Sequence, residues 1–560
     1  MGDVLAGAGL FAATIAAGAA MIWAPSLRRS AAMVIGLALI PVLIGADQWN
    51  SPEISDLRAD GTRFAFLILL AVVTVAALTL VFRRRPVLLP LALIAAIPFR
   101  VPIEAGGQDV NLLIPLYLAI AGGVLATVWT WWESNRDPSG AGGTAGGEPH
   151  LAQDTDVSEH GGAVRRGRTR DRAPSVTGPA AGRMTLLPKV LAVVLVLYAV
   201  QSVYSDDFSR ALQNAIFFYV PFALAFTLLA DRRWDRGLLV AAIAVVAAEA
   251  LVFALFGFGE YATRDLIWNP EVIQSNDFHT YFRVNSLFWD PNIYGRYLAL
   301  VITALVAALL WVRGQGTVLW LGALSLVLWL GLVTTFSQSS FAALLAALAA
   351  LAALRWSLRW TLAACTGIAL AAIAFLLAAG GSLKVDLSTE QTLNKDTGGR
   401  ASLISEGIDL FGDRPLWGYG SGSFSVVYQE QRSGGSGQLT ESHTEPVTVA
   451  SEQGLIGLAA YLALIAVAFV TLCAGMRRSM PGLRGPPETG RPLTDDVARA
   501  AVLACFVGLI VHTMAYAGFL EDPVTWLLLA VGGALAAAPA TAASTSESYE
   551  AEAADGDALR

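Results

Sequence analysis

The sequence predicts an all-α protein that is embedded in a membrane and crosses it many times. Of the 560 residues, 55% are hydrophobic and only 14% are charged, a composition that soluble domains do not have. The apolar residues also gather in runs of about 20, the length of an α-helix that crosses the hydrocarbon core of a bilayer. A soluble enzyme and a nucleic-acid-binding module are therefore excluded.

About fifteen transmembrane helices are predicted, within a range of about twelve to fifteen, at ~20 residues for each helix. The fourth apolar run is short, so it can be interpreted either as a crossing helix or as a re-entrant segment. The predicted spans occupy residues 4–24, 31–46, 64–82, 87–99, 110–132, 186–204, 210–229, 236–258, 291–312, 316–335, 338–354, 358–380, 446–474, 497–517 and 523–540.

Arginine clusters predict the orientation of these spans. The clusters occur in alternate loops, and basic loops face the cytoplasm. Fifteen spans, with the N-terminus outside and the C-terminus inside, satisfy every loop. The clusters lie at residues 28–29, 83–85, 165–172, 232–236, 355–359 and 477–478.

Six segments follow from the spans and the loops between them. The segment after the first spans is rich in Gly, Ala, Asp and Arg and has hardly an aromatic residue, which predicts disorder. The segments are N-terminal transmembrane helices 1–132, a disordered cytoplasmic linker 133–184, transmembrane helices 185–380, a long extracytoplasmic loop 381–445, C-terminal transmembrane helices 446–540 and a disordered acidic cytoplasmic tail 541–560.

Two outer loops, 259–290 and 381–445, are unusually long, and loops of that length are commonly functional. The first ends in R-V-N-S-L-F-W-D-P-N, from Arg283 to Asn292. Asp290 and the proline after it are start signals for the next helix, which explains part of this motif without function. Arg283 has apolar neighbours and is expected at headgroup depth, where a guanidinium is suited to bind phosphate.

The second loop is predicted to contain a short amphipathic helix on the membrane surface. If the chain is helical from Arg400, then Ile404, Ile408 and Phe411 form one apolar stripe. Arg400 heads that stripe and would lie beside a lipid phosphate. The alternative is an interfacial arginine whose charged end reaches back to water.

The end of the second loop holds a histidine ahead of the next span. The positive end of the helix dipole favours the neutral imidazole of His443, which can accept a proton, although a single loop histidine is often inert. Glu452 follows two turns into the membrane, where a carboxylate serves either function or helix packing. The glycines of residues 418–422 follow no strand, so we expect a flexible turn and not a nucleotide loop.

These segments resemble the O-antigen ligase and polymerase family of bacterial membrane glycosyltransferases. The resemblance covers residues 186–470. The carrying segments, in the order of the family, are Arg283 to Asn292, Ser337 to Ser340, and Arg400 through Gly457 with P-L-W-G-Y-G-S-G-S-F at 415–424, His443 and Glu452-x-Gly454.

Two positions depart from the family pattern. Thr444 follows His443 where the family usually has asparagine, which removes an amide that could hold the acceptor. Gln338 follows Ser337 where the family usually has arginine, which removes a positive charge near the expected diphosphate. We therefore assign no phosphate binding to Gln338.

The resemblance implies transfer of a glycan from an undecaprenyl-diphosphate-linked donor to a hydroxyl of a glycan, glycolipid or glycoprotein acceptor. The reaction would invert the anomeric carbon, use no metal and no cofactor, and serve cell-surface polysaccharide biosynthesis. The implied location is the bacterial cytoplasmic (inner) membrane, with the active site on its extracytoplasmic face. The partners are these substrates and the bilayer, and no nucleic acid is expected.

The resemblance also implies roles for single residues. Arg283 and Arg400 would bind the donor diphosphate and stabilise the negative charge that grows on it. His443 would accept the proton of the acceptor hydroxyl. Glu452 lies nine residues after His443 on one helix and therefore on its opposite face. We expect it to act in packing or in support of the catalytic residues, as we do for Ser337, Gln338 and Asn292.

Two other functions would each explain part of the sequence. A transporter or flippase for polysaccharide or lipid-linked glycan would explain the many spans, but no paired Gly- or Pro-broken helices are visible in the sequence. A glycoside hydrolase could use Glu441 with Glu445, or Asp409 with Asp413, but adjacent carboxylates on a polar loop are usually solvated. Ligase and polymerase activities stay open.

Overall fold

The structure is a computed structural model that describes residues 2–49, 51–105, 108–136, 186–269, 272–273, 276, 281–312, 314–379, 400–431, 442–474, 476 and 494–537. Most of the predicted linker 133–184, the first part of the predicted outer loop 381–445 and the predicted tail 541–560 lie outside these residues. The predicted division into six segments stays a prediction.

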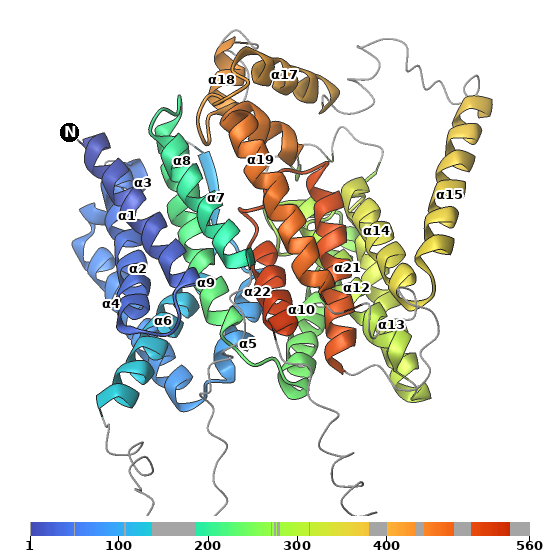
Figure 1. The fold of residues 1–560 in the computed structure, drawn as a ribbon, viewed down its shortest axis with the longest axis horizontal. Coiled ribbons are helices and arrows are strands. Elements are labelled where there is room, and N and C mark those ends of the chain that lie inside the picture. Colours follow the sequence, from blue (N-terminus) through green and yellow to red (C-terminus); the bar gives the residue numbers. More distant parts are fainter. Residues whose placement is uncertain are drawn as a thin grey trace, which may run out of the picture.

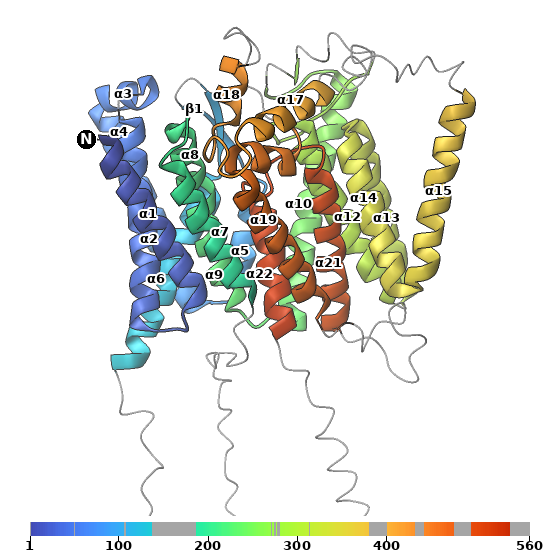
Figure 2. The ribbon, with the colours of Figure 1, turned by 45° about the horizontal axis from the view of Figure 1, so that its top comes forward.

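The protein is built of helices, most of which run side by side (Figures 1 and 2). The helices are α1 (Gly2–Ile22), α2 (Leu27–Gln48), α3 (Pro52–Ala59), α4 (Gly61–Arg84), α5 (Leu88–Ala96), α6 (Ile114–Arg136), α7 (Leu186–Ser202), α8 (Phe208–Asn214), α9 (Val220–Ala230), α10 (Arg236–Thr263), α12 (Pro291–Trp311), α13 (Gln315–Thr334), α14 (Gln338–Arg355), α15 (Leu358–Ala379), α17 (Arg400–Asp413), α18 (Phe424–Gln431), α19 (Glu445–Cys473), α21 (Thr494–Thr513) and α22 (Pro523–Ala537).

The helices agree with a multi-pass membrane protein. Among the described residues, 11 helices are long and apolar enough to cross a bilayer. Three more apolar helices are shorter, Leu186–Ser202, Leu358–Ala371 and Pro523–Ala537. Each of the predicted spans coincides with one of these helices or with α5. The number of crossings stays a prediction, because length and composition alone define these 11.

The fourth predicted span, residues 87–99, contains the short helix α5. Its 9 residues extend over about 13 Å, less than half of the ~30 Å hydrocarbon core. A hairpin follows, in which β1 (Val101–Ala105) pairs antiparallel with β2 (Gln108–Leu112), and Val101 faces Leu112. Figure 2 shows β1 near α8, towards the end where α3 lies. Helix α5 alone is therefore too short to cross the bilayer.

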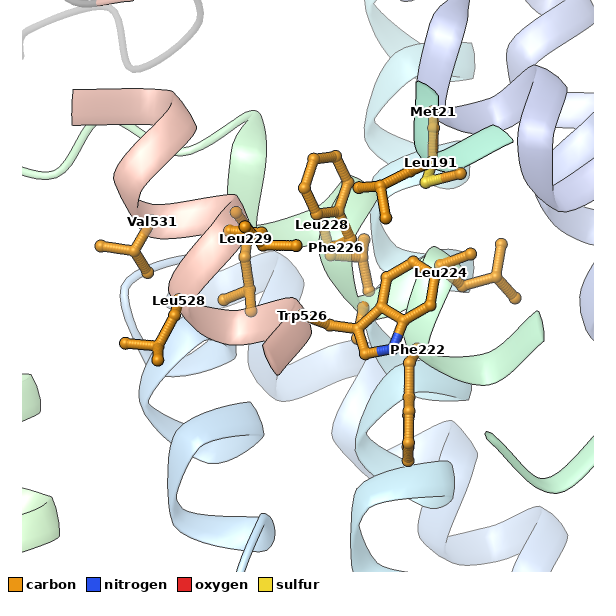
Figure 3. Packing of buried hydrophobic residues seen from close by; sticks show 14 of the residues in the cluster. Met21, Leu191, Phe222, Leu224, Phe226, Leu228, Leu229, Trp526, Leu528 and Val531 are labelled. Atoms are coloured by element: carbon orange, nitrogen blue, oxygen red, sulfur yellow. The ribbon is translucent and has the colours of Figure 1, made fainter. Parts of the chain in front are cut away.

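Helix α9 lies at the centre of the hydrophobic core. All but one of its residues are buried, and the helix packs against α1, α2, α6 and α22. Figure 3 shows Phe222 and Phe226 of α9 beside Trp526 of α22, with Met21 and Leu191 close by. Phe226 and Trp526 meet edge to face, with ring centroids 6.5 Å apart. Protein surrounds this helix, so its apolar side chains stabilise the bundle by close packing.

A wider π-helical turn, Ala215–Tyr219 (η2), joins α8 to α9. Single turns of this kind occur mostly inside α-helices and frequently at functional sites. Here the turn has Asn214 before it, and Phe217 and Phe218 within it, on the wall of a cavity. The π-turn therefore connects the central helix to a polar cavity described below.

Candidate active site at the starts of α12, α14 and α19 and the end of α21

Arg283 is held in place by polar groups from three segments. Its Nε donates to the carbonyl oxygen of Thr335 at 3.0 Å, and its Nη2 donates to Oδ1 of Asn292 at 3.1 Å. The side chain of Asn276 accepts from the Arg283 amide and donates to its carbonyl oxygen. Both of these partners are neutral groups, and they fix the direction of the guanidinium.

Asn292 continues this network into the turn between α13 and α14. Its Oδ1 also accepts from Oγ of Ser337 at 2.8 Å. Ser337 is the N-cap of α14, and its hydroxyl lies 3.2 Å from that of Ser339 and 2.8 Å from that of Ser340. Gln338 is exposed beside this buried cluster. The structure therefore brings together Arg283, Asn292 and Ser337, three of the residues singled out in the sequence.

His512 extends the serine cluster to the end of α21. Its Nε2 lies 3.2 Å from Oγ of Ser339, and the imidazole is fully buried. Two residues further along the chain, the carbonyl oxygen of Met514 accepts from Oγ1 of Thr444 at 3.2 Å. Hydrogen bonds thus lead from Arg283 to His512. Two residues along the chain from His512, Met514 continues the path to Thr444, the residue that follows His443.

His443 lies immediately before the N-cap of α19, as the sequence predicts. Thr444 is that N-cap, and its side chain makes no capping hydrogen bond to the helix. His443 is half-buried and has the unusual left-handed φ of 58°. Glu445, in the first turn, accepts from the amides of Gly518 and Phe519 at 2.6 and 3.1 Å. The start of α19 is therefore tied to the segment between α21 and α22.

Helix α17 begins at Arg400, where the sequence predicts a helix, and it crosses the end of α19 together with α18 (Figure 2). Leu403, Gly407 and Leu410 form its buried face, and the position of Gly407 faces Val447 of α19. Ile408, from the predicted apolar stripe, is 55% exposed. Helix α17 thus packs on protein through one apolar face and exposes another. The side chain of Arg400 lies outside the described part of the structure.

Helix α18 packs against α17. Burial raises the pKa of the Tyr428 phenol, and the charge of the neighbouring Glu406 carboxylate raises this pKa further. The phenol therefore stays protonated near neutral pH. Stacking of Tyr428 on Phe424, with ring centroids 6.0 Å apart, completes a small apolar cluster with Leu410 under the two helices.

Helix α19 is broken at Gly454, which has φ 64° and ψ −163°. The segment that follows α17 fills the break. The amides of Tyr419 and Gly420 donate to the carbonyl oxygens of Ser451 and Glu452, and the amide of Leu455 donates to the carbonyl oxygen of Pro415. The groups released by the break are thus paired with protein, as non-helical backbone at membrane depth requires.

The glycine-rich stretch 418–422 is buried and fixed, so the expectation of a flexible turn is wrong. Gly418, Gly420 and Gly422 all have positive φ. A Cβ on Gly420 would come within 2.2 Å of the Ser205 backbone. Close packing against α19 and the chain before α8 therefore leaves no room for a Cβ at Gly418 or Gly420.

Glu452 holds the same loop by its side chain. Its Oε2 accepts from the amide of Gly422 at 2.8 Å, and its Oε1 accepts from the amide of Phe424 at 3.1 Å. The carboxylate is buried in α19. In this structure Glu452 binds backbone amides of the loop.

A cavity lined by three arginines lies next to the hydrogen-bond network of Arg283 and Asn292. This cavity was not predicted from the sequence. We call it the arginine cavity. Its wall contains Arg100, Arg210, Gln213, Asn214, Phe217, Phe218, Ile293, Arg296, Tyr516, Ala517, Gly518, Glu521 and Asp522. A second cavity shares part of this wall and adds Tyr198, Glu445, Glu452 and Tyr461. The available signal was arginine on the predicted outer side, where it is less common than on the inner side.

The helices and the buried polar network define a multi-pass membrane protein with a site at one end of its helices. Residues 323–462 match the family model described as O-antigen ligase, which confirms the resemblance over this part of the chain. The matched part contains Ser337, Arg400, His443 and Glu452, whereas Arg283 and Asn292 precede it. No curated protein matches the chain. The match associates the protein with glycan transfer in polysaccharide biosynthesis at a membrane.

Proposed function

We propose that the protein transfers a glycan from an undecaprenyl-diphosphate-linked donor to an acceptor hydroxyl on the extracytoplasmic face of the bacterial cytoplasmic membrane. One observation carries the proposal: the hydrogen-bond path from Arg283 through Asn292, Ser337 and Ser339 runs inside and beside the O-antigen ligase match. Through His512 and the carbonyl oxygen of Met514, the path continues to Thr444, which is next to the proposed base His443.

The proposed reaction is a single displacement with inversion. The acceptor oxygen attacks the anomeric carbon, and the bond from this carbon to the diphosphate oxygen breaks. The electron pair leaves with the diphosphate, and the acceptor proton passes to the imidazole of His443. Since a diphosphate is a stable anion, the reaction needs no proton donor to the leaving group and, in this proposal, no metal.

Arg283 and Arg400 have electrostatic roles in this proposal. Negative charge develops on the leaving diphosphate, and a fixed positive group in a site of low dielectric stabilises it by roughly 3 kcal/mol. The neutral partners Asn292 and Thr335 support this role for Arg283, because they orient its guanidinium in advance. Arg400 is assigned by its place in the resemblance alone.

A transporter is the second candidate, and the break in α19 is the observation that favours it. Transporters commonly place substrates and ions at broken helices. Here, however, loop amides donate hydrogen bonds to the carbonyl oxygens at the break. The Gln201 side chain donates to the carbonyl oxygen of Gln453 at 2.9 Å. Protein groups therefore occupy carbonyls that an ion would use.

The test is glycan transfer in proteoliposomes that contain a lipid-diphosphate-linked oligosaccharide. Release of free lipid diphosphate would be compared in the wild type, His443→Ala, Arg283→Ala and Arg400→Ala. Arg63→Ala is the matched control, because Arg63 is an exposed arginine at the start of α4. We expect release to fall at least a hundredfold in His443→Ala and to stay unchanged in Arg63→Ala.

Product length would separate the two kinds of transfer, since a polymerase makes a ladder and a ligase makes one product. An intact donor with every acceptor class would contradict the transferase proposal. The same vesicles would then be assayed for translocation of the lipid-linked glycan, which is the outcome that a transporter predicts.

A further inference from the structure

The arginine cavity has no role in the proposed reaction, yet its construction indicates a ligand. Arg100 follows α5, Arg210 belongs to α8 and Arg296 belongs to α12. Three separate elements thus bring a guanidinium to one small space. Arginine is costly to bury without a partner, so a wall of this kind requires a reason.

Two donors in this cavity lack a partner among the described residues. Nε of Arg100 and Nη1 of Arg296 are buried, and neither makes a hydrogen bond to any residue that the structure describes. The side chain of Arg296 is only 5% exposed. A buried N–H group of a charged side chain that stays unpaired is strongly unfavourable. Unpaired N–H donors on the wall of a cavity are positioned to bind a ligand that accepts hydrogen bonds.

The charges on the wall favour an anionic acceptor. Three arginines face two carboxylates, Glu521 and Asp522, which leaves a formal charge of +3 − 2 = +1. Asp522 forms a buried ion pair with Arg296 through Nη2. This pair leaves the other terminal nitrogen of the same guanidinium unbound. An anion in the cavity would therefore meet donors whose direction is already fixed.

The arrangement of the donors distinguishes phosphate from carboxylate. A planar carboxylate is satisfied by the fork of a single guanidinium, whereas a tetrahedral phosphate offers oxygens in several directions. Arg100, Arg210 and Arg296 approach from three elements. We propose that the arginine cavity is a binding site for a phosphate-class oxyanion, which is either a free phosphate or diphosphate or the headgroup of a phosphorylated lipid.

The cavity borders the network of Arg283 but consists of other residues. Arg296 lies one helical turn after Asn292 on α12, and its guanidinium is 5.9 Å from the ring of Tyr516. Tyr516 in turn packs against His512, with ring centroids 5.7 Å apart. An anion bound here would lie beside the buried network. The inference does not depend on the proposed transfer reaction.

The test measures anion binding by the full-length protein in nanodiscs of phosphatidylcholine. One arm titrates inorganic phosphate and pyrophosphate in a calorimeter. The other arm adds a polyprenyl monophosphate to the nanodiscs and detects retained lipid by native mass spectrometry. Arg100→Gln removes the charge and one unpaired donor, and Arg63→Gln is the matched control on an exposed arginine.

We expect saturable binding of at least one of the two probe classes to the wild type. Binding should weaken at least tenfold in Arg100→Gln, because a hydrogen bond to a charged group is lost, and should not change in Arg63→Gln. The arm that shows binding identifies the source of the phosphate. His443→Ala should bind as the wild type does, even if it abolishes transfer, so the two proposals fail separately.

A second variant covers the case in which Arg100→Gln does not fold. The double variant Arg296→Gln with Asp522→Asn replaces the buried ion pair by a neutral pair of amides, and it should weaken binding by at least the same factor. Three results would overturn the proposal: no saturable binding to either probe class, wild-type binding in the folded variants, or, when glucuronate is titrated in the calorimeter as a carboxylate probe, tighter binding of glucuronate than of pyrophosphate.

Discussion

The loop before α12 and the loop before α18 reach the same end of the molecule and are both fixed by a buried glutamate. Oε2 of Glu260, from α10, accepts from the amide of Ser286 at 2.7 Å, and Oε2 of Glu452, from α19, accepts from the amide of Gly422 at 2.8 Å. They differ in their remaining bonds. Side chains such as Asn285 hold the first loop, whereas the second loop also enters the break of α19 and bonds to its backbone.

The difference concerns tolerance to substitution. A loop that is held by side chains has several independent contacts, and loss of one leaves the others in place. A loop that is held by backbone in a helix break depends on glycine conformations that other residues rarely adopt. We therefore expect the second loop to be more sensitive to substitution than the first.

The largest effect is expected for Gly454→Ala. Its φ and ψ lie in a region open almost only to glycine, and a Cβ would come within 2.5 Å of the Leu416 backbone. A loss of more than ~3 kcal/mol is expected, so the yield of monodisperse protein in detergent should collapse. Ser286→Gly is the counterpart in the first loop, where only the hydrogen bond to the Phe253 carbonyl oxygen is lost. If both variants fold equally well, the second loop is not more sensitive to substitution than the first.

A smaller effect is expected for Glu452→Gln and Glu260→Gln. The carboxylate of Glu452 accepts from two loop amides, and a glutamine has only one acceptor oxygen. An unpaired buried amide costs about 1–3 kcal/mol, which should lower the unfolding temperature by several degrees. Glu260 has a longer second bond, 3.4 Å to the amide of Ile267, so its substitution should lower this temperature less. The reverse order, measured by tryptophan fluorescence in nanodiscs, would contradict the ranking.

Asn292→Ala is predicted to act on catalysis more than on folding. The change removes the acceptor shared by Nη2 of Arg283 and Oγ of Ser337, so the arginine loses its fixed direction. The rate of glycan transfer should fall about tenfold or more, which corresponds to loss of one charged hydrogen bond. Asn292→Asp keeps an acceptor oxygen and should restore part of the rate. Equal rates in the two variants would show that the acceptor oxygen of Asn292 does not contribute to transfer.

The smallest effect is expected for Ser339→Ala. It breaks the contact with His512 but leaves the bonds of Ser337 to Asn292 and Ser340 intact. The free energy of unfolding should change by about 1 kcal/mol, and transfer should change by no more than a few-fold. Gln338→Ala, at an exposed neighbour, should change neither quantity. A large loss of transfer in Ser339→Ala would show that the second loop depends on the first through His512.

Much of the fold could be predicted because hydropathy reports exclusion from water. Every apolar run predicted as a span lies on a helix. Hydropathy does not report what covers the helix, however. The apolar helix α9 is buried in protein, whereas α15, which is also apolar, stands apart in Figures 1 and 2 and exposes Leu362, Ile368 and Leu370. The length of apolar runs also does not predict the β-hairpin that follows α5.

The site could be predicted only in part, because its decisive contacts join distant segments. The sequence indicated Arg283, Asn292 and Ser337 but not the bond of Ser339 to His512, which lies 173 residues away. The break of α19 at Gly454 could not be predicted, since a single glycine in a long apolar run gives no sign of positive φ. Arg296 follows the motif from Arg283 to Asn292 on α12, and its buried contact with Asp522 joins segments that are far apart in the sequence.

The burial of α9 also has a consequence for biogenesis. About 290 residues of chain separate the end of α9 from the start of α22. At roughly 5–20 residues per second of synthesis, α22 leaves the ribosome roughly 15–60 s after α9. Until then, the face of α9 that receives Trp526 must be covered by lipid chains or other helices. Closure of the central core is therefore a late event, and a nascent chain stalled before α22 would display an incomplete apolar surface to the bilayer and its quality-control proteases.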